Sequence, residues 1–204
     1  MLLRPSSVAL IIANLAPLVG VLLLDWQVFD ILMLYWVENV VIGVVNVLRM
    51  GVSSSGAKGF LIPFFLIHYG LFCFGHLTAV TAIFSDAVGA GTAWDYFFGT
   101  PIFDAWHTPL WVAIATIAAS HLFSFFGNFV AGGEYRRVTA RQLMHRPYGR
   151  IVVLHVAIII GAALTQWLGS PVMMLVVLIV AKIVADLRLH HSERDKFAAK
   201  LATS

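Results

Sequence analysis

The sequence predicts an all-α protein, a polytopic bundle of six transmembrane helices that forms a single domain over residues 1–204. Hydrophobic residues make up 60% of the chain and charged residues 11%, whereas a soluble domain carries about 25% charged residues. The mean hydropathy is +0.91. These values leave little room for a soluble part, and one domain is the usual expectation at this length.

Six continuous apolar stretches are each near the ~20 residues that a helix needs to cross a bilayer. Strands of a membrane barrel would alternate apolar and polar residues, so these stretches predict helices. The last two are joined by Gly169-Ser170-Pro171, which predicts a tight turn and a helical hairpin. The predicted spans are residues 8–24, 28–48, 60–84, 110–130, 151–168 and 172–187.

The basic residues predict how the bundle is oriented. In a six-span arrangement every Lys and Arg except Lys182 falls on one side of the membrane, and the opposite loops carry Asp. The positive-inside rule then places both termini in the cytoplasm. The rule also accounts for the sequence pI of about 9.2, so no nucleic-acid partner is needed to explain it. The loop arginines are predicted to set topology and to contact anionic lipids: Arg136, Arg137, Arg141, Arg146 and Arg150.

A loop on the opposite side, residues 85–109, is rich in aromatic residues. Aromatic side chains at a span end are typical of the membrane–water interface. A short lid over an outward-facing cavity is the alternative, and the sequence does not decide between them.

Polar groups within the spans fall into two layers when a rise of ~1.5 Å per residue is counted from the span ends. The layer near the midplane contains Glu38, His76 and His121, with Lys182 slightly to the cytoplasmic side. Two His and one carboxylate at the same depth can hold a divalent metal, and the same groups could form a proton relay. The alternative is a protonated Glu38 bonded to a neighbouring helix.

The second layer, nearer the predicted cytoplasmic face, supplies a more complete ligand set. Three His and one Asp suit zinc or another divalent transition metal, which could activate water for hydrolysis. Alternatively, Asp186 and Lys182 neutralise each other one helical turn apart, and the histidines bond backbone or lipid headgroups. The predicted ligands are His68, His155, Asp186 and His190, with Lys182 as the charge partner and Asn39, Asn46 and Asn128 as polar lining.

Four runs of residues carry a family resemblance: Tyr35 to Gly43, His68 to Phe72 with His76, Pro147 to His155, and Lys182 through Asp186 to His190. In these runs the chain resembles a family of uncharacterised prokaryotic integral membrane proteins with a domain of unknown function. The resemblance extends over essentially the whole chain. It implies a six-span bundle in a prokaryotic plasma membrane, and it implies no activity.

Multi-span zinc hydrolases of the ceramidase and progestin-receptor type offer a weaker analogy. They also place three His and an Asp near the cytoplasmic face. They have more spans and a terminal His-x-x-x-His, where this chain has Asp186-x-x-x-His190.

Three functions therefore compete at this stage. The first is a metal-dependent membrane hydrolase acting on a lipid or another membrane-embedded substrate. The second is a proton-coupled transporter that uses Glu38, Lys182 and Asp186. The third is a b-type haem electron carrier, with axial pairs such as His76 with His121 or His68 with His155. Whether the chain is an enzyme stays open, as does assembly into a homo-oligomer.

Overall fold

The computed structural model describes residues 28–54, 57–84, 108–169, 172–173, 175–181 and 183–184, and within these ranges the regular secondary structure is helical, without strands. The chain divides into two compact units. Phe29–Val152 forms what we call the main unit, and Met1–Val28 with Val153–Ser204 forms the second. The predicted all-α class is confirmed for the described residues.

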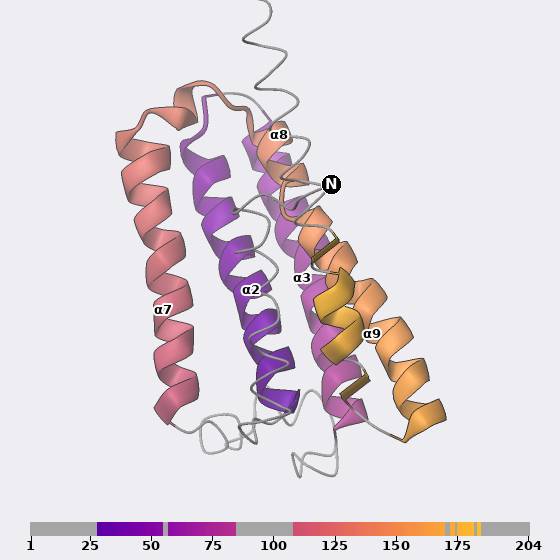
Figure 1. Ribbon diagram of the computed structural model, residues 1–204. Helices are drawn as coiled ribbons and strands as arrows, with labels where there is room; N and C mark the ends of the chain where they lie inside the picture. Colours follow the sequence, from indigo (N-terminus) through magenta and orange to yellow (C-terminus); the bar gives the residue numbers. More distant parts are fainter. Residues whose placement is uncertain are drawn as a thin grey trace, which may run out of the picture. The chain divides into compact units, whose positions relative to one another are not determined.

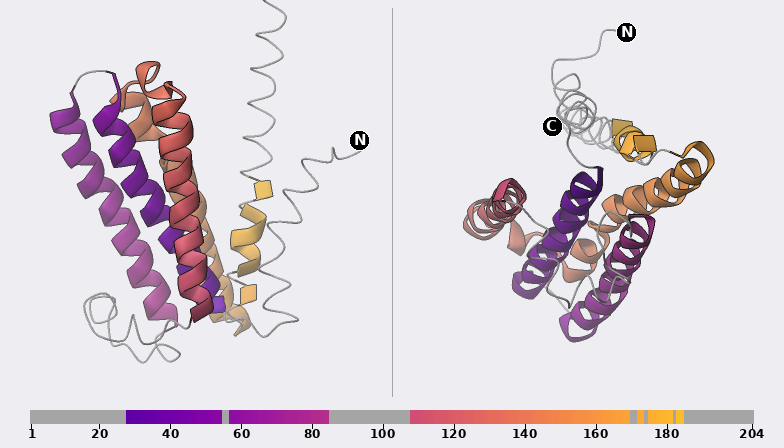
Figure 2. Two further views of the ribbon diagram at one scale, coloured as in Figure 1. Left: turned by 90° about the vertical axis from the view of Figure 1, so that its left-hand side faces the viewer. Right: turned by 90° about the horizontal axis from the view of Figure 1, so that it is seen from below.

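The main unit is built from long helices joined by short ones. Figures 1 and 2 show α2 between α7 and α3. The π-helix η1 continues α7 directly, and the first turn of α9 also belongs to this unit. In chain order the elements are α2 (Val28–Val52), α3 (Lys58–Ile83), α7 (Thr108–Ser124), η1 (Phe125–Ala131), the 3-10 helix η2 (Glu134–Arg136), α8 (Ala140–His145) and α9 (Tyr148–Leu168).

Four helices in the described residues are long and apolar enough to cross a membrane: Val28–Val52, Lys58–Ile83, Trp111–Ala131 and Ala140–Leu168. They correspond to the predicted spans 28–48, 60–84, 110–130 and 151–168. The predicted span 8–24 lies outside the described residues. Of the predicted span 172–187, the described residues between 172 and 184 are helical. Four of the six predicted spans thus have an observed helical counterpart of sufficient length.

The core of the main unit lies at one end, where α2 ends and α3 begins; we call this the α8 end. Ala140 and Leu143 of α8 are fully buried there. The core combines side chains from α2, α3, η1, α8 and α9: Val45, Met50, Phe65, Tyr69, Cys73, Phe125, Phe129, Ala140, Leu143 and Ile151. Burial of this apolar surface fixes the ends of the helices against one another.

Residues 131–150, which the sequence analysis assigned to a cytoplasmic loop, are folded into this core. Thr139 begins α8 with a capping box, because its hydroxyl accepts from the Gln142 N–H at 3.2 Å. The Gln142 side chain in turn accepts from the Thr139 N–H at 3.0 Å. Two otherwise unsatisfied N–H groups are thereby bonded. The structure adds a capped helix to this segment between two predicted spans, and the apolar residues that this helix buries are averaged with its arginines in hydropathy.

Helices α2 and α3 approach closely around Gly43. A Cβ at this glycine would lie only 2.6 Å from Cε1 of Tyr69. The Tyr69 hydroxyl donates to the backbone oxygen of Asn39 at 3.0 Å, and Nε1 of Trp36 donates to the backbone oxygen of Cys73 at 2.7 Å. Small size at one position and two hydrogen bonds therefore hold the helix that carries Glu38 against α3.

Candidate functional site

An ion pair joins α2 to the first turn of α9. Nη1 of Arg150 donates to Oε1 of Glu38 at 2.7 Å, with the Arg150 side chain 51% exposed and the Glu38 side chain 22% exposed. The sequence analysis identified Glu38 as a midplane carboxylate but assigned Arg150 to a loop. The structure corrects this assignment, because Arg150 lies within α9 and is the partner of Glu38.

The position of Arg150 is unfavourable for the helix itself. A cation in the first turn faces the positive end of the helix dipole, which costs about 0.3–1 kcal/mol. The charge-assisted hydrogen bond to Glu38 offsets this cost. Helix stability alone does not explain a charge at this place.

Two further titratable side chains surround the ion pair. His121 of α7, partly buried, interacts electrostatically with Glu38, Arg150 and Arg49. The buried Tyr69 of α3 interacts electrostatically with both members of the pair. The ion pair between α2 and α9 thus lies within electrostatic reach of titratable side chains on α3 and α7.

The predicted second metal site does not assemble around this pair. Glu38, His76 and His121 all lie in described helices, and His76 is buried on α3. Within the described ranges, no three His, Cys, Asp or Glu side chains are grouped so that they could hold a metal ion. Both roles predicted for these residues stay predictions.

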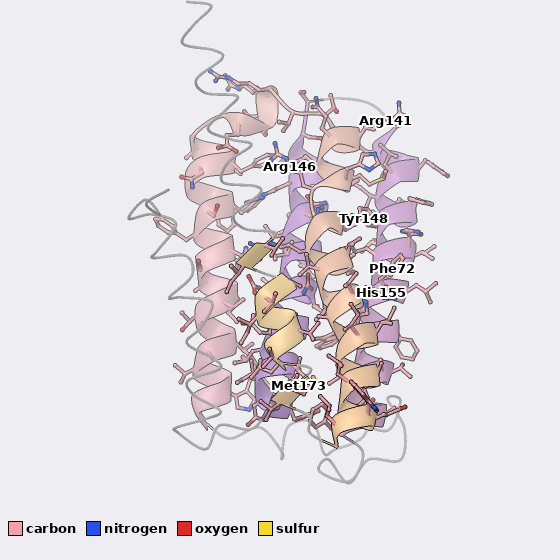
Figure 3. The ribbon with its side chains drawn as sticks, turned by 45° about the vertical axis from the view of Figure 1, so that its right-hand side comes forward. Phe72, Arg141, Arg146, Tyr148, His155 and Met173 are labelled. Atoms are coloured by element: carbon pink, nitrogen blue, oxygen red, sulfur yellow. The ribbon has the colours of Figure 1, made fainter. Side chains whose placement is uncertain are left out.

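His68, a predicted zinc ligand, is held by an unexpected partner at the start of α9. Its Nδ1 lies 2.8 Å from the hydroxyl of Tyr148. The ring also stacks on Phe64, with centroids 5.2 Å apart, and meets Phe72 edge-on at 5.1 Å. Figure 3 shows Tyr148 at the beginning of α9. The ring orientation of His68 is thus fixed by packing and by one hydrogen bond.

The remaining predicted zinc ligands are spread over other parts of the chain. His155 is exposed on α9, seven residues after Tyr148, and belongs to the second unit (Figure 3). Asp186 and His190 lie outside the described residues, as does Lys182. The four-ligand site therefore stays a prediction.

The three asparagines predicted as polar lining differ in their surroundings. Asn46 is buried, and its amide donates to the backbone oxygen of Leu143 at 3.1 Å. Asn39 is buried next to Glu38, and its amide donates to the backbone oxygen of Tyr35 at 2.8 Å. Asn128 is exposed on η1. Only Asn39 lies beside the ion pair, whereas Asn46 anchors α8 to α2.

Sequence reasoning missed the roles of Tyr148 and Arg150, although both lie in a run that carried the family resemblance. The available signal was an aromatic hydroxyl and a guanidinium within three residues, immediately before an apolar span.

Searches of curated proteins and of solved structures found no match. The profile of a family of unknown function matches residues 1–203. The chain therefore belongs to the Family of unknown function (DUF6498).

Proposed function

We propose that the protein is a proton-coupled membrane transporter in which Glu38 binds the proton and Arg150 is its counter-ion. The observation that supports this proposal is the 2.7 Å ion pair between α2 and α9, within helices apolar enough to cross a membrane. Ionisable side chains inside membrane spans are rare and usually belong to ion or substrate pathways. Lys182 and Asp186 are proposed to extend the same pathway.

Protonation of Glu38 would change the charge of the pair from zero to plus one. The neutral carboxyl then no longer neutralises Arg150, so the guanidinium attracts an anion to the site. Loss of the proton restores the ion pair and expels the anion. His121 of α7 and Tyr69 of α3 interact electrostatically with the same pair and would tune its proton affinity. Proton and anion would thus move together without net charge.

The proposal is tested in proteoliposomes under an inward proton gradient. Proton uptake is followed with a pH-sensitive dye trapped inside the vesicles, with monovalent phosphate or small carboxylates as solutes. We expect proton uptake that depends on one of these anions and is abolished by Glu38→Gln. Glu134→Gln, which removes an exposed glutamate on η2, is the matched control and should retain uptake.

An infrared titration reports on Glu38 without knowledge of the solute. The carbonyl band of protonated carboxyl groups should rise at acid pH in both proteins, and the wild type minus Glu38→Gln difference should contain one further component that titrates with Glu38. Identical titrations of the two proteins would overturn the assignment of Glu38. Proton-coupled uptake that survives in Glu38→Gln would overturn it as well.

A metal-dependent hydrolase is the second candidate, with His68, His155, Asp186 and His190 binding zinc or another divalent transition metal. The hydrogen bond between Nδ1 of His68 and the Tyr148 hydroxyl favours it. Metal-ligating histidines are usually oriented by such a bond at the nitrogen that does not bind the metal. Protein purified without a metal-affinity tag should then contain stoichiometric metal, and Tyr148→Phe should lower its metal affinity. A metal-free protein after incubation with zinc would exclude this function.

The haem carrier is tested by the absorbance of the purified protein, because bound haem gives a Soret band.

We also propose a six-span topology in a prokaryotic plasma membrane, with both termini in the cytoplasm and with contacts to anionic lipids. In a Cys73→Ser background, a cysteine at position 204 should react only from the cytoplasmic side. A cysteine at position 85 should react only from the outside. Labelling of both from the same side would contradict the proposed topology.

A further inference from the structure

Arg49, in the last turn of α2, is a partly buried guanidinium with few partners. Its Nη2 donates to Oγ of Ser124 over a long 3.4 Å, and its Cζ lies 5.5 Å from the centroid of the Phe129 ring. Its Nε is buried without a hydrogen-bond acceptor. A guanidinium has five N–H donors, and leaving a buried donor unsatisfied is costly. The site around Arg49 thus lacks an acceptor.

A second arginine places another positive charge near Arg49. Arg146, at the junction of α8 and α9, is exposed and repels Arg49 electrostatically. Glu134 attracts Arg49 electrostatically, but within the described ranges no ion pair joins a carboxylate to Arg49. Figure 3 shows Arg146 and Arg141 on different sides of α8. The backbone of Arg146 is held near α2, because its N–H and the amide of Asn46 donate to the same backbone oxygen of Leu143.

The π-helix explains why Ser124 and Phe129 both reach Arg49. Residues five apart lie about 140° from each other on an α-helix, whereas a π turn brings them onto nearly the same face. The N–H of Gly132 bonds to the backbone oxygen of Gly127 at 3.1 Å, five residues earlier, as in a π turn. Short π-helical segments are frequent at functional sites. The winding of η1 therefore builds one wall of this place.

We propose that Arg49, Arg146 and the Ser124 hydroxyl form a binding site for a phosphate group. An anion here would accept hydrogen bonds from Nε of Arg49 and from Arg146, and it would remove their mutual repulsion. Guanidinium groups match the oxygens of phosphate in geometry as well as in charge. The hydroxyl of Ser124 accepts from Arg49 and can donate its own proton to the anion. This site does not depend on the proposed transport function.

The phosphate could belong to a lipid headgroup or to a soluble molecule, and the test separates the two. One arm measures binding of inorganic phosphate and glycerol phosphate to the detergent-solubilised protein by thermal shift and phosphorus NMR. The other arm uses native mass spectrometry of protein from nanodiscs of phosphatidylcholine, with or without phosphatidylglycerol. Arg49→Gln and Arg146→Gln should each weaken binding roughly tenfold or more.

Arg141→Gln is the matched control, because it removes one exposed charge at the same end of the unit on another side of α8. It should leave the binding of inorganic phosphate and glycerol phosphate unchanged, and it should weaken retention of phosphatidylglycerol less than Arg146→Gln does. Arg49→Lys keeps the charge at this position and should retain part of the binding that Arg49→Gln loses. Binding of the soluble phosphates identifies a soluble ligand, and retention of phosphatidylglycerol alone identifies a lipid headgroup. Absence of both in the wild type would overturn the proposal. Equal losses in Arg141→Gln and Arg146→Gln would also overturn it.

Discussion

Helix α2 and the continuous line of α7 and η1 are both apolar enough to cross a membrane, yet their surroundings differ. In the most apolar stretch of α2, 44% of the residues are buried, against 11% in Trp111–Ala131. The polar residues Asn39 and Asn46 of α2 are buried and hydrogen-bonded, whereas Asn128 of η1 is exposed. Hydropathy therefore predicts which segments are helical, but the placement of small and polar residues shows which helix is central.

The largest expected effect concerns the part of the α7–η1 line that is buried. Phe129 is 1% exposed in the core, whereas Phe123, two turns earlier, is 78% exposed. Phe129→Ala should lower the free energy of unfolding by about 3–5 kcal/mol, because it leaves a cavity at the α8 end. Phe123→Ala is the control and should cost far less. Similar losses for the two variants in an unfolding titration would show that α7 is covered along its length.

A smaller effect is expected from glycine substitutions that compare α2 directly with the α7–η1 line. Gly43→Ala on α2 places a Cβ against Tyr69, and overpacking of this kind costs about 1–3 kcal/mol. Gly127→Ala on η1 meets nothing within 4 Å, so its melting temperature should stay the same or rise slightly. If Gly43→Ala melted no earlier than Gly127→Ala, the close approach of α2 and α3 would be disproved.

The smallest effect is expected from the asparagines. Asn46→Ala removes the bond to the Leu143 oxygen, which also accepts from the Arg146 N–H at 3.1 Å. Because that oxygen keeps one donor, the loss should be about 0.5–1.5 kcal/mol. Asn128→Ala is the exposed control. Hydrogen exchange should also speed up in residues 140–145 of the Asn46 variant alone, and unchanged exchange there would argue against Asn46 as the anchor of α8.

The fold was predictable where one physical signal dominates. Long apolar runs predicted α2, α3, the α7–η1 line and α9 to within a few residues. The signal failed for residues 131–150, because the buried Ala140 and Leu143 are interspersed with arginines that average out in hydropathy. The capping pair Thr139 and Gln142 was visible in the sequence, but its meaning depends on a core that only the tertiary structure provides.

The candidate site was half predictable. Glu38 stood out because a carboxylate in an apolar span is costly, but its partner could not be read from depth alone. Arg150 precedes the predicted fifth span, so in the sequence it resembles any cation of a connecting loop. Only the structure shows that α8 and α9 follow each other closely and that Arg150 lies within the helix. His68 stood out as a histidine in a span, and its bond to Tyr148 depends on how α3 and α9 pack.

The first turn of α9 is held by two side-chain hydrogen bonds, one on each side of the helix. Tyr148 and Arg150 are two residues apart, so their side chains leave the helix about 200° from each other, one to His68 of α3 and one to Glu38 of α2. While both bonds hold, this turn cannot rotate about its own axis without breaking one of them. Neutralising Glu38 would remove one of the two fixed points, and the turn would then be held by the bond to His68 and by the burial of Ile151.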